Sequence, residues 1–508
     1  MKLVLVLLNK LQFEYDILSL VKSFYKEIDV KVMHEEDESE QIVNKITKDV
    51  YEIDTVIRVR FADDSISASA YSYKEHIRCI GSSKVLTVYK DRNIDDDRKS
   101  DKNTLKKVIY ELISKRLDRQ LPWGTLTGIR PTKIVMGLLK EGKSDSEIRQ
   151  KMKETYYISD ESLDISLEIV KREREILRKI NREDGYSLYI GIPFCPTTCL
   201  YCSFTSYPIK RFEDRVRAYL DALFLEIDYV SENHGADLVD TIYIGGGTPT
   251  TLNEEQLRYL LDKINRSFNI DKLLEYTVEA GRPDTITMEK LKVMKEYGVK
   301  RISINPQTMN QKTLDLIGRG HSVDEIITAF RMAKEVGIEN VNMDIILGLP
   351  GEGIEEVTHT LREIKKLGPD SLTVHSLALK RASKMYEWVM KNGQDALNNS
   401  ERIVNETRAT AESMKMVPYY LYRQKNMAGN FENIGYSKVD MYGYYNIIIM
   451  EEVQDIIAIG AGSVSKRVNS DGLVKRCDCA KDIDLYINDI DEMINRKREL
   501  FDRGRDGN

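Results

Sequence analysis

Three cysteines crowd into one short segment and are the side chains best suited to chemistry. Cys195, Cys199 and Cys202 follow the pattern C-x3-C-x2-C. Thiolates are soft ligands that suit iron–sulfur clusters and zinc. A structural zinc site takes four ligands, whereas only three cysteines lie together here and the nearest histidines are His76 and His234. Three cysteines leave one iron of a [4Fe–4S] cluster open for substrate chemistry, so we favour that cluster; a zinc site or three buried cysteines are the alternatives.

Other polar candidates also follow apolar runs. The glycine-rich loop 245–249 could bring backbone close to a ligand, although alone it could be only a turn. Glu279 could accept hydrogen bonds from hydroxyl or amino groups, or it could simply be an acid at a helix N-terminus. His321 and His375 lie near strand ends too, but most such histidines are structural. We treat them as candidates of second rank.

A repeated strand–turn–helix pattern from about residue 187 must position these residues. Parallel strands need crossover helices, and (β/α) enzymes carry their chemistry at the carboxyl ends of the strands. Six units are too few for a closed eight-stranded barrel, so we predict an α/β fold with a partial, open (β/α)6 TIM-like barrel. The expected strands are Leu188–Ile192, Thr241–Ile244, Glu275–Glu279, Arg301–Asn305, Asn340–Leu347 and Ser371–Leu377. The expected helices include Glu254–Asn265, Met288–Tyr297, Val323–Val336 and Glu355–Lys366.

The rest of the chain suggests three further regions. We predict an α+β N-terminal extension over 1–120, a helical connector over 121–185, the barrel core over 186–385 and a small C-terminal α+β domain over 386–508. The segment Leu121–Pro131 is dense in turn formers, Pro131–Ile180 has helical periodicity, and a charged helix is expected over Asp482–Leu500. We expect the charge run Asp95–Lys102 to be a solvated loop or the approach to a helix. Strands of the extension are expected at Lys2–Leu8, Thr55–Phe61, Ile66–Tyr73 and Lys84–Tyr89.

Composition narrows the class of protein. The 508 residues are 42% hydrophobic and 31% charged, as in an ordinary globular protein, and the net charge of -6 argues against a general nucleic-acid binder. No apolar run approaches the roughly 20 residues of a membrane span. The run Leu3–Leu8 is too short for a signal peptide and is expected to be a buried strand, so we expect a cytoplasmic protein. Six cysteines in this length do not form a disulfide framework.

The cysteine spacing resembles that of the radical S-adenosylmethionine superfamily. Four further segments, in the expected order, are similar to the oxygen-independent coproporphyrinogen III oxidase-like family, which includes oxidases, haem chaperones and HemZ-type coproporphyrinogen dehydrogenases. Those segments are Tyr243–Thr250, Thr277–Ala280, Arg301–Thr308 and Asp344–Gly351. The resemblance covers about 187–380 well and continues more weakly through 433–436 and 459–463, and Leu121–Pro131 resembles the HemZ-type branch.

The resemblance implies two cofactors and a set of residues that bind them. It places a [4Fe–4S] cluster on the three cysteines and S-adenosylmethionine beside it. The glycine loop would contact the methionine amino group, Glu279 the ribose or amino group, and Arg319 a carboxylate. Tyr189 would lie near the cluster and Tyr201 near the adenine. The implied cofactor-binding residues are Tyr189, Tyr201, Gly246, Gly247, Thr248, Glu279, Gln307, Arg319, Asp344 and Ala378.

The resemblance also implies a reaction. The reduced cluster is a low-potential one-electron donor that splits S-adenosylmethionine into methionine and a 5'-deoxyadenosyl radical. That radical would abstract hydrogen from a propionate side chain of coproporphyrinogen III, and loss of CO2 and an electron would leave a vinyl group, twice. An electron donor such as a flavodoxin or ferredoxin would be needed. No catalytic side chain is predicted.

One departure from the oxidases leaves a second function open. The oxidases carry a further cysteine two residues after the third, where this chain has Phe204, as the haem chaperones of the family do. The tetrapyrrole could therefore be haem carried as cargo. The long N-terminal extension, which short chaperones lack, favours the enzyme. Cys477 and Cys479 could supply a distant thiol pair, but an incidental pair on a surface hairpin is the simpler interpretation.

Overall fold

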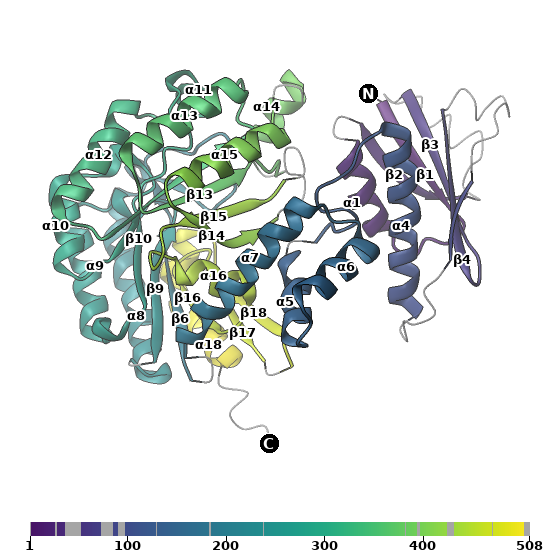
Figure 1. The fold of residues 1–508 in the computed structure, drawn as a ribbon. Coiled ribbons are helices and arrows are strands. Elements are labelled where there is room, and N and C mark those ends of the chain that lie inside the picture. Colours follow the sequence, from purple (N-terminus) through teal and green to yellow (C-terminus); the bar gives the residue numbers. More distant parts are fainter. Residues whose placement is uncertain are drawn as a thin grey trace. The chain divides into compact units, whose positions relative to one another are not determined.

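The computed structural model describes residues 2–25, 28–35, 52–72, 85–89, 97–128, 130–181, 184–236, 238–380, 383–393, 397–423, 431–469 and 471–501. The chain forms two compact units (Figure 1). The first comprises Met1–Glu168 with Arg423–Phe431, and the second Ile169–Tyr422 with Glu432–Asn508. The domain boundaries expected from the sequence stay predictions.

The first unit is built on a five-stranded mixed sheet. Its strand order is β2-β1-β3-β4-β5, parallel from β2 to β3 and antiparallel from β3 to β5. The strands are β1 (Lys2–Leu8), β2 (Asp29–His34), β3 (Glu52–Phe61), β4 (Ser65–Ser72) and β5 (Leu86–Tyr89). The helices are α1 (Glu14–Phe24), α4 (Asp97–Leu117), α5 (Thr132–Lys140), α6 (Asp145–Tyr156) and α7 (Asp160–Ile176), of which α7 ends in the second unit.

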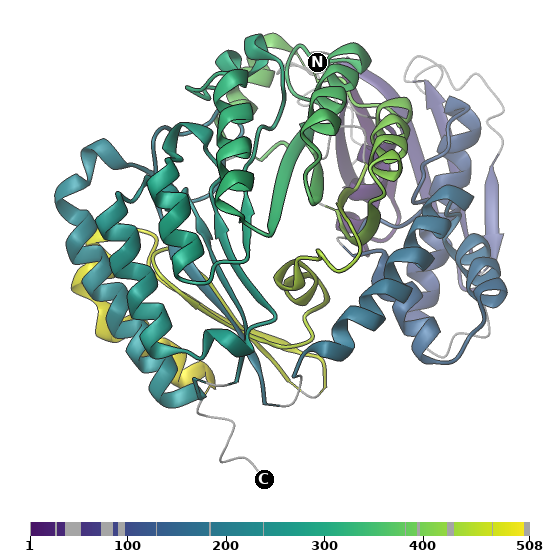
Figure 2. The ribbon, with the colours of Figure 1, turned by 60° about the vertical axis from the view of Figure 1, so that its left-hand side comes forward.

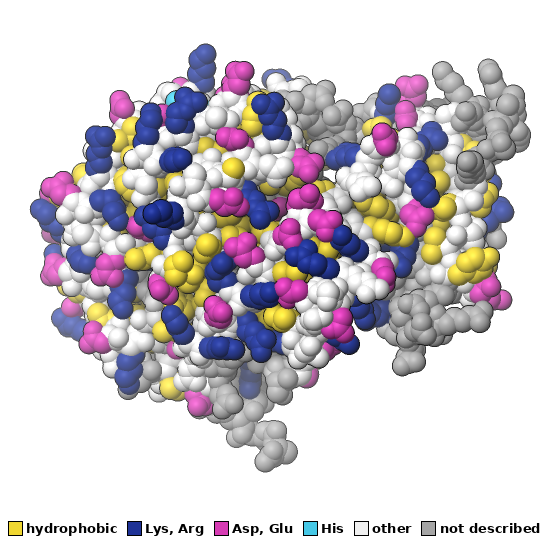
Figure 3. Space-filling model, viewed as in Figure 1, with side chains coloured by type: hydrophobic (Ala, Val, Ile, Leu, Met, Phe, Trp, Pro, Cys, Tyr) yellow, Lys and Arg dark blue, Asp and Glu magenta, His cyan; other side chains and the backbone are white. Residues whose placement is uncertain are grey.

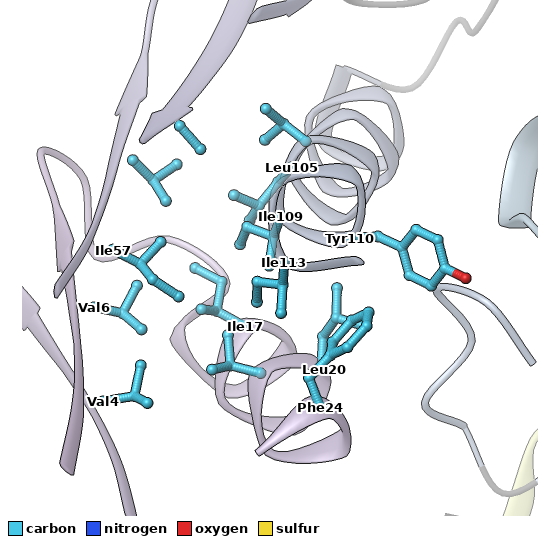
Figure 4. Close-up of a cluster of buried hydrophobic side chains, with 14 of the residues drawn as sticks. Val4, Val6, Ile17, Leu20, Phe24, Ile57, Leu105, Ile109, Tyr110 and Ile113 are labelled. Carbon is cyan, nitrogen blue, oxygen red and sulfur yellow. The ribbon is translucent and has the colours of Figure 1, made fainter. Parts of the chain in front are cut away.

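Helices α1 and α4 pack against one face of this sheet. Figure 4 shows Val4, Val6 and Ile57 of the sheet facing Ile17 and Leu20 of α1 and the apolar side of α4. Burial of such side chains is worth about 1.5–3 kcal/mol each before chain entropy is counted. The expected strand Lys2–Leu8 is therefore confirmed as a buried central strand.

The turn-rich segment that begins at Leu121 is a buried turn of the first unit. Trp123 is buried, and the guanidinium of Arg423 lies 5.8 Å from its ring centroid. Gly124 has φ +52°, and a Cβ there would come within 1.9 Å of the Tyr156 carbonyl oxygen. Only glycine fits this close approach, so the turn holds the end of α6 in place.

The second unit is organised around one curved sheet of eleven strands. Its order is β14-β15-β13-β12-β11-β10-β9-β6-β16-β17-β18. The run from β13 to β16 is parallel, and both outer ends are antiparallel. The strands are β6 (Tyr186–Ile192), β9 (Val239–Gly246), β10 (Glu275–Glu279), β11 (Arg301–Ser303), β12 (Asn340–Leu347), β13 (Ser371–Ser376), β14 (Val417–Tyr422), β15 (Asn433–Ser437), β16 (Asp455–Ile459), β17 (Val464–Val468) and β18 (Val474–Asp478). Two short strands, β7 (Phe194–Cys195) and β8 (Tyr207–Pro208), pair separately.

The predicted open barrel of six strand–helix units is confirmed. Helices on the convex side of the sheet follow the strands in turn, as Figure 2 shows. The α-helices between β6 and β14 along the chain are α8 (Val216–His234), α9 (Glu254–Ser267), α10 (Met288–Glu296), α11 (Gln311–Leu316), α12 (Val323–Val336), α13 (Ile354–Leu367), α14 (Lys384–Asn392) and α15 (Glu401–Ser413). Capping boxes begin α9 at Asn253 and α12 at Ser322, and left-handed Gly337 ends α12. These local signals explain why both helices begin at the residues that the sequence predicts.

The concave face of the sheet is polar, which is unusual for parallel strands. Thr241 donates to the Ser187 hydroxyl at 2.9 Å, and Ser187 donates to Gln454 at 3.0 Å. On the other side, the Asn342 amide donates to the Ser303 hydroxyl at 3.0 Å and accepts from Ser371 at 3.0 Å. Alternate side chains point outward into the helices and are apolar. This alternation supplies a polar interior whose groups bond to one another.

A helix from the C-terminal part of the chain lies on this concave side. Figure 2 shows α16 (Tyr444–Glu451) inside the curve of the sheet. The Tyr445 ring stacks on Tyr243 at 4.5 Å, and its backbone N–H donates to Glu275 at 3.0 Å. The C-terminal segment thus lies in the barrel interior and gives the buried Glu275 carboxylate a second donor beside the Thr277 hydroxyl.

The C-terminal end also contributes α17 (Ile483–Asn488) and α18 (Ile490–Phe501). The sequence predicted one helix over Asp482–Leu500; that prediction was wrong, because Asp489 leaves the helical conformation between the two. The charge run was expected outside a helix, yet residues from Asp97 onward form the first turns of α4. Tyr73, Lys84, Cys79, Asp95 and Asp96 lie outside the described residues.

Cys477 lies on the hairpin of β17 and β18, as expected, but Cys479 is not at the surface. It is 5% exposed and packs against a buried ion pair. The Lys497 ammonium donates to Glu226 and lies 2.9 Å from the Cys479 sulfur. Glu226 also accepts from the Gly460 N–H at 2.8 Å and from Tyr486. This cluster joins α18 to α8 and β16.

Charged side chains of both signs are interspersed over the face of the second unit that Figure 3 shows. In the described part of the chain, every helix falls short of the length and apolar character that crossing a membrane requires.

Removing one member of the buried pair should destabilise the second unit strongly. Lys497→Met leaves Glu226 charged and unpaired in the interior, which costs about 3–5 kcal/mol. Urea titration with pulsed hydrogen exchange and mass spectrometry, read on peptides from α8 and α18, measures this loss. Glu226→Gln combined with Lys497→Met leaves no buried charge and keeps an acceptor for Gly460, so it should recover much of the stability. Equal losses in the single and double variants would contradict this account.

Candidate active site at the strand ends

The three cysteines follow the carboxyl end of β6: Cys195 ends β7, and Cys199 and Cys202 lie in the loop after it. Within this loop Cys202 N–H donates to the Cys199 carbonyl at 3.1 Å, and Leu200 N–H ties the loop to the Ile317 carbonyl at 2.9 Å. Each thiol is half-buried. Burial raises the pKa of Cys195 to about 11, with the two neighbouring thiols adding to the rise. The thiols are thus close enough to influence one another's ionisation, and metal binding must displace their protons.

The glycine loop after β9 lies directly against the first cysteine. Gly247 N–H donates to the Ile192 carbonyl at 2.8 Å, and the Thr248 hydroxyl lies 3.5 Å from Cys195 Sγ. A Cβ on Gly247 would meet the Phe194 carbonyl at 2.6 Å and Cys195 Sγ at 3.0 Å. Gly246 has φ +107°, which also favours glycine. The loop therefore places bare backbone beside the cysteines.

Glu279 ends β10 next to the same loop. Tyr243 donates to its carboxylate at 2.6 Å, and Tyr189 stacks near Tyr243 with ring centroids 6.2 Å apart. Burial raises the pKa of Glu279 to about 7; hydrogen bonds from Tyr243 and Gly246 oppose that rise, and Asp344 adds to it. Near neutral pH this carboxyl is therefore poised between its two protonation states.

Arg319 and Tyr201 lie together. Arg319 donates to the Tyr201 hydroxyl at 2.8 Å and to the carbonyls of Gly281 at 2.5 Å and Asn305 at 2.9 Å. Both terminal nitrogens are thus engaged, and the buried Nε is left without a hydrogen-bond partner in the structure. The predicted bidentate pairing with a carboxylate would need an exchange of these bonds and stays a prediction.

Gln307 lies four residues beyond the end of β11, beside Asp344 within β12. Gln307 adopts φ +66°, its N–H donates to the Asp344 carbonyl at 2.9 Å, and its buried side-chain oxygen has no partner in the structure. Burial opposes ionisation of Asp344, but His375, 3.7 Å away, and Asn342 outweigh it and hold the Asp344 pKa below its usual value. A non-glycine residue in the left-handed region is strained, and the buried side-chain oxygen of Gln307 has no hydrogen-bond partner in the structure. A ligand that donates a hydrogen bond to this oxygen could supply one.

Ala378 follows β13 by two residues and is half-buried. Of the second-rank histidines, His375 lies beside Asp344 while its Nδ1 is 3.3 Å from the Tyr422 hydroxyl. His321 is buried 3.7 Å from Asp284. The cofactor roles of all these residues stay predictions.

Sequence reasoning missed several residues that the fold brings here: Tyr243, Tyr445, Arg282 and Asp284. The sequence carried a signal for Tyr243. Polar residues alternate with apolar ones along its strand, whereas a strand of a parallel sheet is usually apolar throughout, and this alternation indicates an inward-facing polar side chain. Tyr445 had no such signal, since it arrives from a helix about 200 residues downstream of Tyr243.

The chemistry of the site suits its cofactors. Three half-buried thiols, backbone without a Cβ beside them, and orphaned polar atoms on Gln307 and Arg319 fit a cluster with a polar ligand against it. Within the described ranges, no three Cys, His, Asp or Glu side chains are grouped so as to hold a single metal ion.

Comparison with known proteins defines the class. The sequence pattern of the radical SAM superfamily matches residues 189–364. Proteins of this superfamily use a [4Fe–4S] cluster and S-adenosylmethionine, and these are the cofactors of this class of protein.

Individual relatives define the family. The chain is 42% identical over 412 residues to the oxygen-independent coproporphyrinogen-III oxidase-like protein HemZ of Bacillus subtilis, covering 79% of this chain and 82% of that one. It is 37% identical over 243 residues to the haem chaperone HemW of the same organism, covering 48% and 63%. The solved coproporphyrinogen III oxidase of Escherichia coli covers 63% of this chain and 73% of its own, with 23% identity and a TM-score of 0.49. The chain belongs to the oxygen-independent coproporphyrinogen-III oxidase-like family.

The close approach at Gly247 should be essential for cluster binding. Gly247→Ala puts a methyl group 3.0 Å from Cys195 Sγ and against two carbonyl oxygens, so we expect iron and sulfide content after reconstitution to fall several-fold. Gly137→Ala, where a Cβ meets open space, is the matched control. Full cluster content in Gly247→Ala would show that the loop does not constrain the cysteines.

Glu279 should make S-adenosylmethionine binding depend on pH. If the carboxylate form accepts the cofactor's hydrogen bonds, affinity should rise about tenfold from pH 6 to pH 8, as a group with pKa about 7 ionises. Anaerobic equilibrium dialysis of the cluster-loaded protein measures this. Glu279→Gln should bind more weakly at pH 8 and lose the dependence, whereas exposed Glu289→Gln should keep it. A flat profile in the unaltered protein would refute the role.

Proposed function

We propose that this protein catalyses the oxidative decarboxylation of coproporphyrinogen III to protoporphyrinogen IX without oxygen. The observation that carries the proposal is the length of the match to HemZ. It covers 79% of the chain, more than the residues from 186 onward could supply, so it includes part of the N-terminal extension. The match to HemW covers 48%. A shared extension supports a shared role with the HemZ-type branch.

In this proposal Cys195, Cys199 and Cys202 hold the cluster. Reductive cleavage of the bound S-adenosylmethionine supplies the species that takes hydrogen from the substrate. The chain's own residues bind and orient the cofactor. The missing Cβ at Gly247 lets this loop pack directly against Phe194 and Cys195, which places the loop beside the cofactor site in this proposal.

The two carboxyl groups nearby have different tasks. Asp344, held ionised by His375 and Asn342, can balance positive charge on the bound cofactor. Glu279, poised near neutrality, can accept hydrogen bonds from it. Behind them, α16 lies in the polar interior of the sheet, where its Tyr445 N–H donates to Glu275. In this proposal α16 keeps bulk water from reaching the site from behind.

The proposal also includes a substrate, an electron donor and a cellular compartment. Propionate side chains make the substrate a polyanion, and a soluble one-electron donor such as a flavodoxin or ferredoxin would reduce the cluster. We propose that the protein acts in the cytoplasm.

A second candidate, a haem chaperone, rests on one residue. Phe204 stands where the oxidases carry a cysteine; its side chain is 71% exposed, with the Lys380 ammonium 5.4 Å from the ring centroid. An exposed aromatic ring beside a cation could bind a flat tetrapyrrole with acidic side chains whether that tetrapyrrole is substrate or cargo.

One anaerobic assay separates the two functions. The reconstituted protein is incubated with dithionite, S-adenosylmethionine and coproporphyrinogen III, and we expect protoporphyrinogen IX with about two 5'-deoxyadenosines per product, one for each propionate. Cys195→Ala should give neither product. Substrate-independent 5'-deoxyadenosine with no tetrapyrrole change, together with tight haem binding, would overturn the oxidase in favour of the chaperone.

A further inference from the structure

A buried arginine lies against the cysteine loop and has no part in the cofactor set predicted from the sequence. Arg282 follows β10 by three residues and is 4% exposed. Its Nη1 donates to the Thr197 hydroxyl at 3.0 Å and to Cys199 Sγ at 3.8 Å. One guanidinium nitrogen therefore contacts both the turn between the first two cysteines and the sulfur of the second.

The other side of the guanidinium is fixed by Asp284. Arg282 Nε and Nη2 donate to the two carboxylate oxygens of Asp284, each at 2.9 Å, in the planar fork that lysine cannot form. Partial burial opposes ionisation of Asp284, but His321 and Arg282 outweigh it and hold its pKa well below the usual range. The carboxylate thus stays charged and aims the arginine at the loop.

This arrangement has an electrostatic consequence for a cluster on Cys199. One-electron reduction adds negative charge to the cluster and its thiolates. A fixed cation and a hydrogen bond to a ligand sulfur stabilise that added charge, and both are recognised ways in which a protein tunes cluster potential. Desolvation strengthens the effect, since the guanidinium is almost completely buried.

We propose that Arg282 is a positioning and tuning residue for the cluster: it holds the Thr197–Cys199 turn and raises the cluster's reduction potential. Asp284 aims Arg282 and partly offsets its charge. The inference rests on Cys199 being a cluster ligand, as proposed above, and it does not depend on which tetrapyrrole the protein uses.

The test is redox potentiometry of the reconstituted protein, followed by electron paramagnetic resonance of the reduced cluster, without tetrapyrrole. In Arg282→Gln, the ratio of reduced to oxidised cluster at a fixed potential should fall about tenfold, which is a midpoint lower by about 59 mV for one electron. Arg282→Lys keeps the charge but not the fork, and its midpoint should lie between the two. Lys292→Gln removes an exposed lysine of α10 and should leave the midpoint unchanged.

Asp284→Asn gives a shift of opposite sign. It keeps an acceptor for Arg282 but removes the offsetting negative charge, so the reduced fraction should rise. If Arg282→Gln fails to hold a cluster, this rise alone decides the question. A wild-type midpoint in Asp284→Asn and in whichever Arg282 variants load a cluster would overturn the inference.

These outcomes are distinct from failure of the proposed function. Cluster loss in Cys199→Ala tests the ligand assignment, and the tetrapyrrole assay tests the reaction. Shifted potentials in a protein that leaves coproporphyrinogen III unchanged would keep the role of Arg282 and remove only the oxidase.

Discussion

The polar inner face of the parallel sheet is the constraint on which the second unit depends. Parallel strands usually bury apolar side chains on both faces, and each buried polar group here must find a partner. Ser187, Thr241 and Gln454 bond to one another across strands, and Glu275 takes a backbone donor from Tyr445. The curved sheet and the C-terminal helix inside it therefore satisfy each other. The C-terminal segment is thus part of the barrel's interior.

The candidate site follows from this arrangement. Polar residues point inward along the strands towards the carboxyl edge, where Glu279 lies against Gly245 of the glycine loop and the same loop reaches Cys195 through Thr248. Their environments separate them: burial raises the pKa of Glu279 to about 7, whereas His375 and Asn342 keep the pKa of Asp344 low. Two carboxyl groups on nearby strands of one sheet thus have pKa values shifted in opposite directions, because their partners differ.

Local signals made much of the barrel predictable. The strand Asn340–Leu347 and the helix Val323–Val336 have the predicted bounds, because an apolar run and a capping box at Ser322 are encoded within a few residues. The predicted single helix over Asp482–Leu500 failed at Asp489, where a break is not marked by glycine or proline. The burial of Cys479 against Lys497 and Glu226 could not be foreseen either, because those partners lie 18 and 253 residues away.

By itself the sequence determined the spacing of the three cysteines, the run of three glycines at the end of β9, and the order along the chain of the strands that carry them. Those features are local, since a ligand spacing or a strand end is written in neighbouring residues. Only the tertiary structure decided that Arg282 contacts Cys199, that Tyr445 stacks on Tyr243, and that Glu279 titrates near neutral pH. Contacts and dielectric environment depend on which distant segments exclude water together, and no local pattern encodes that.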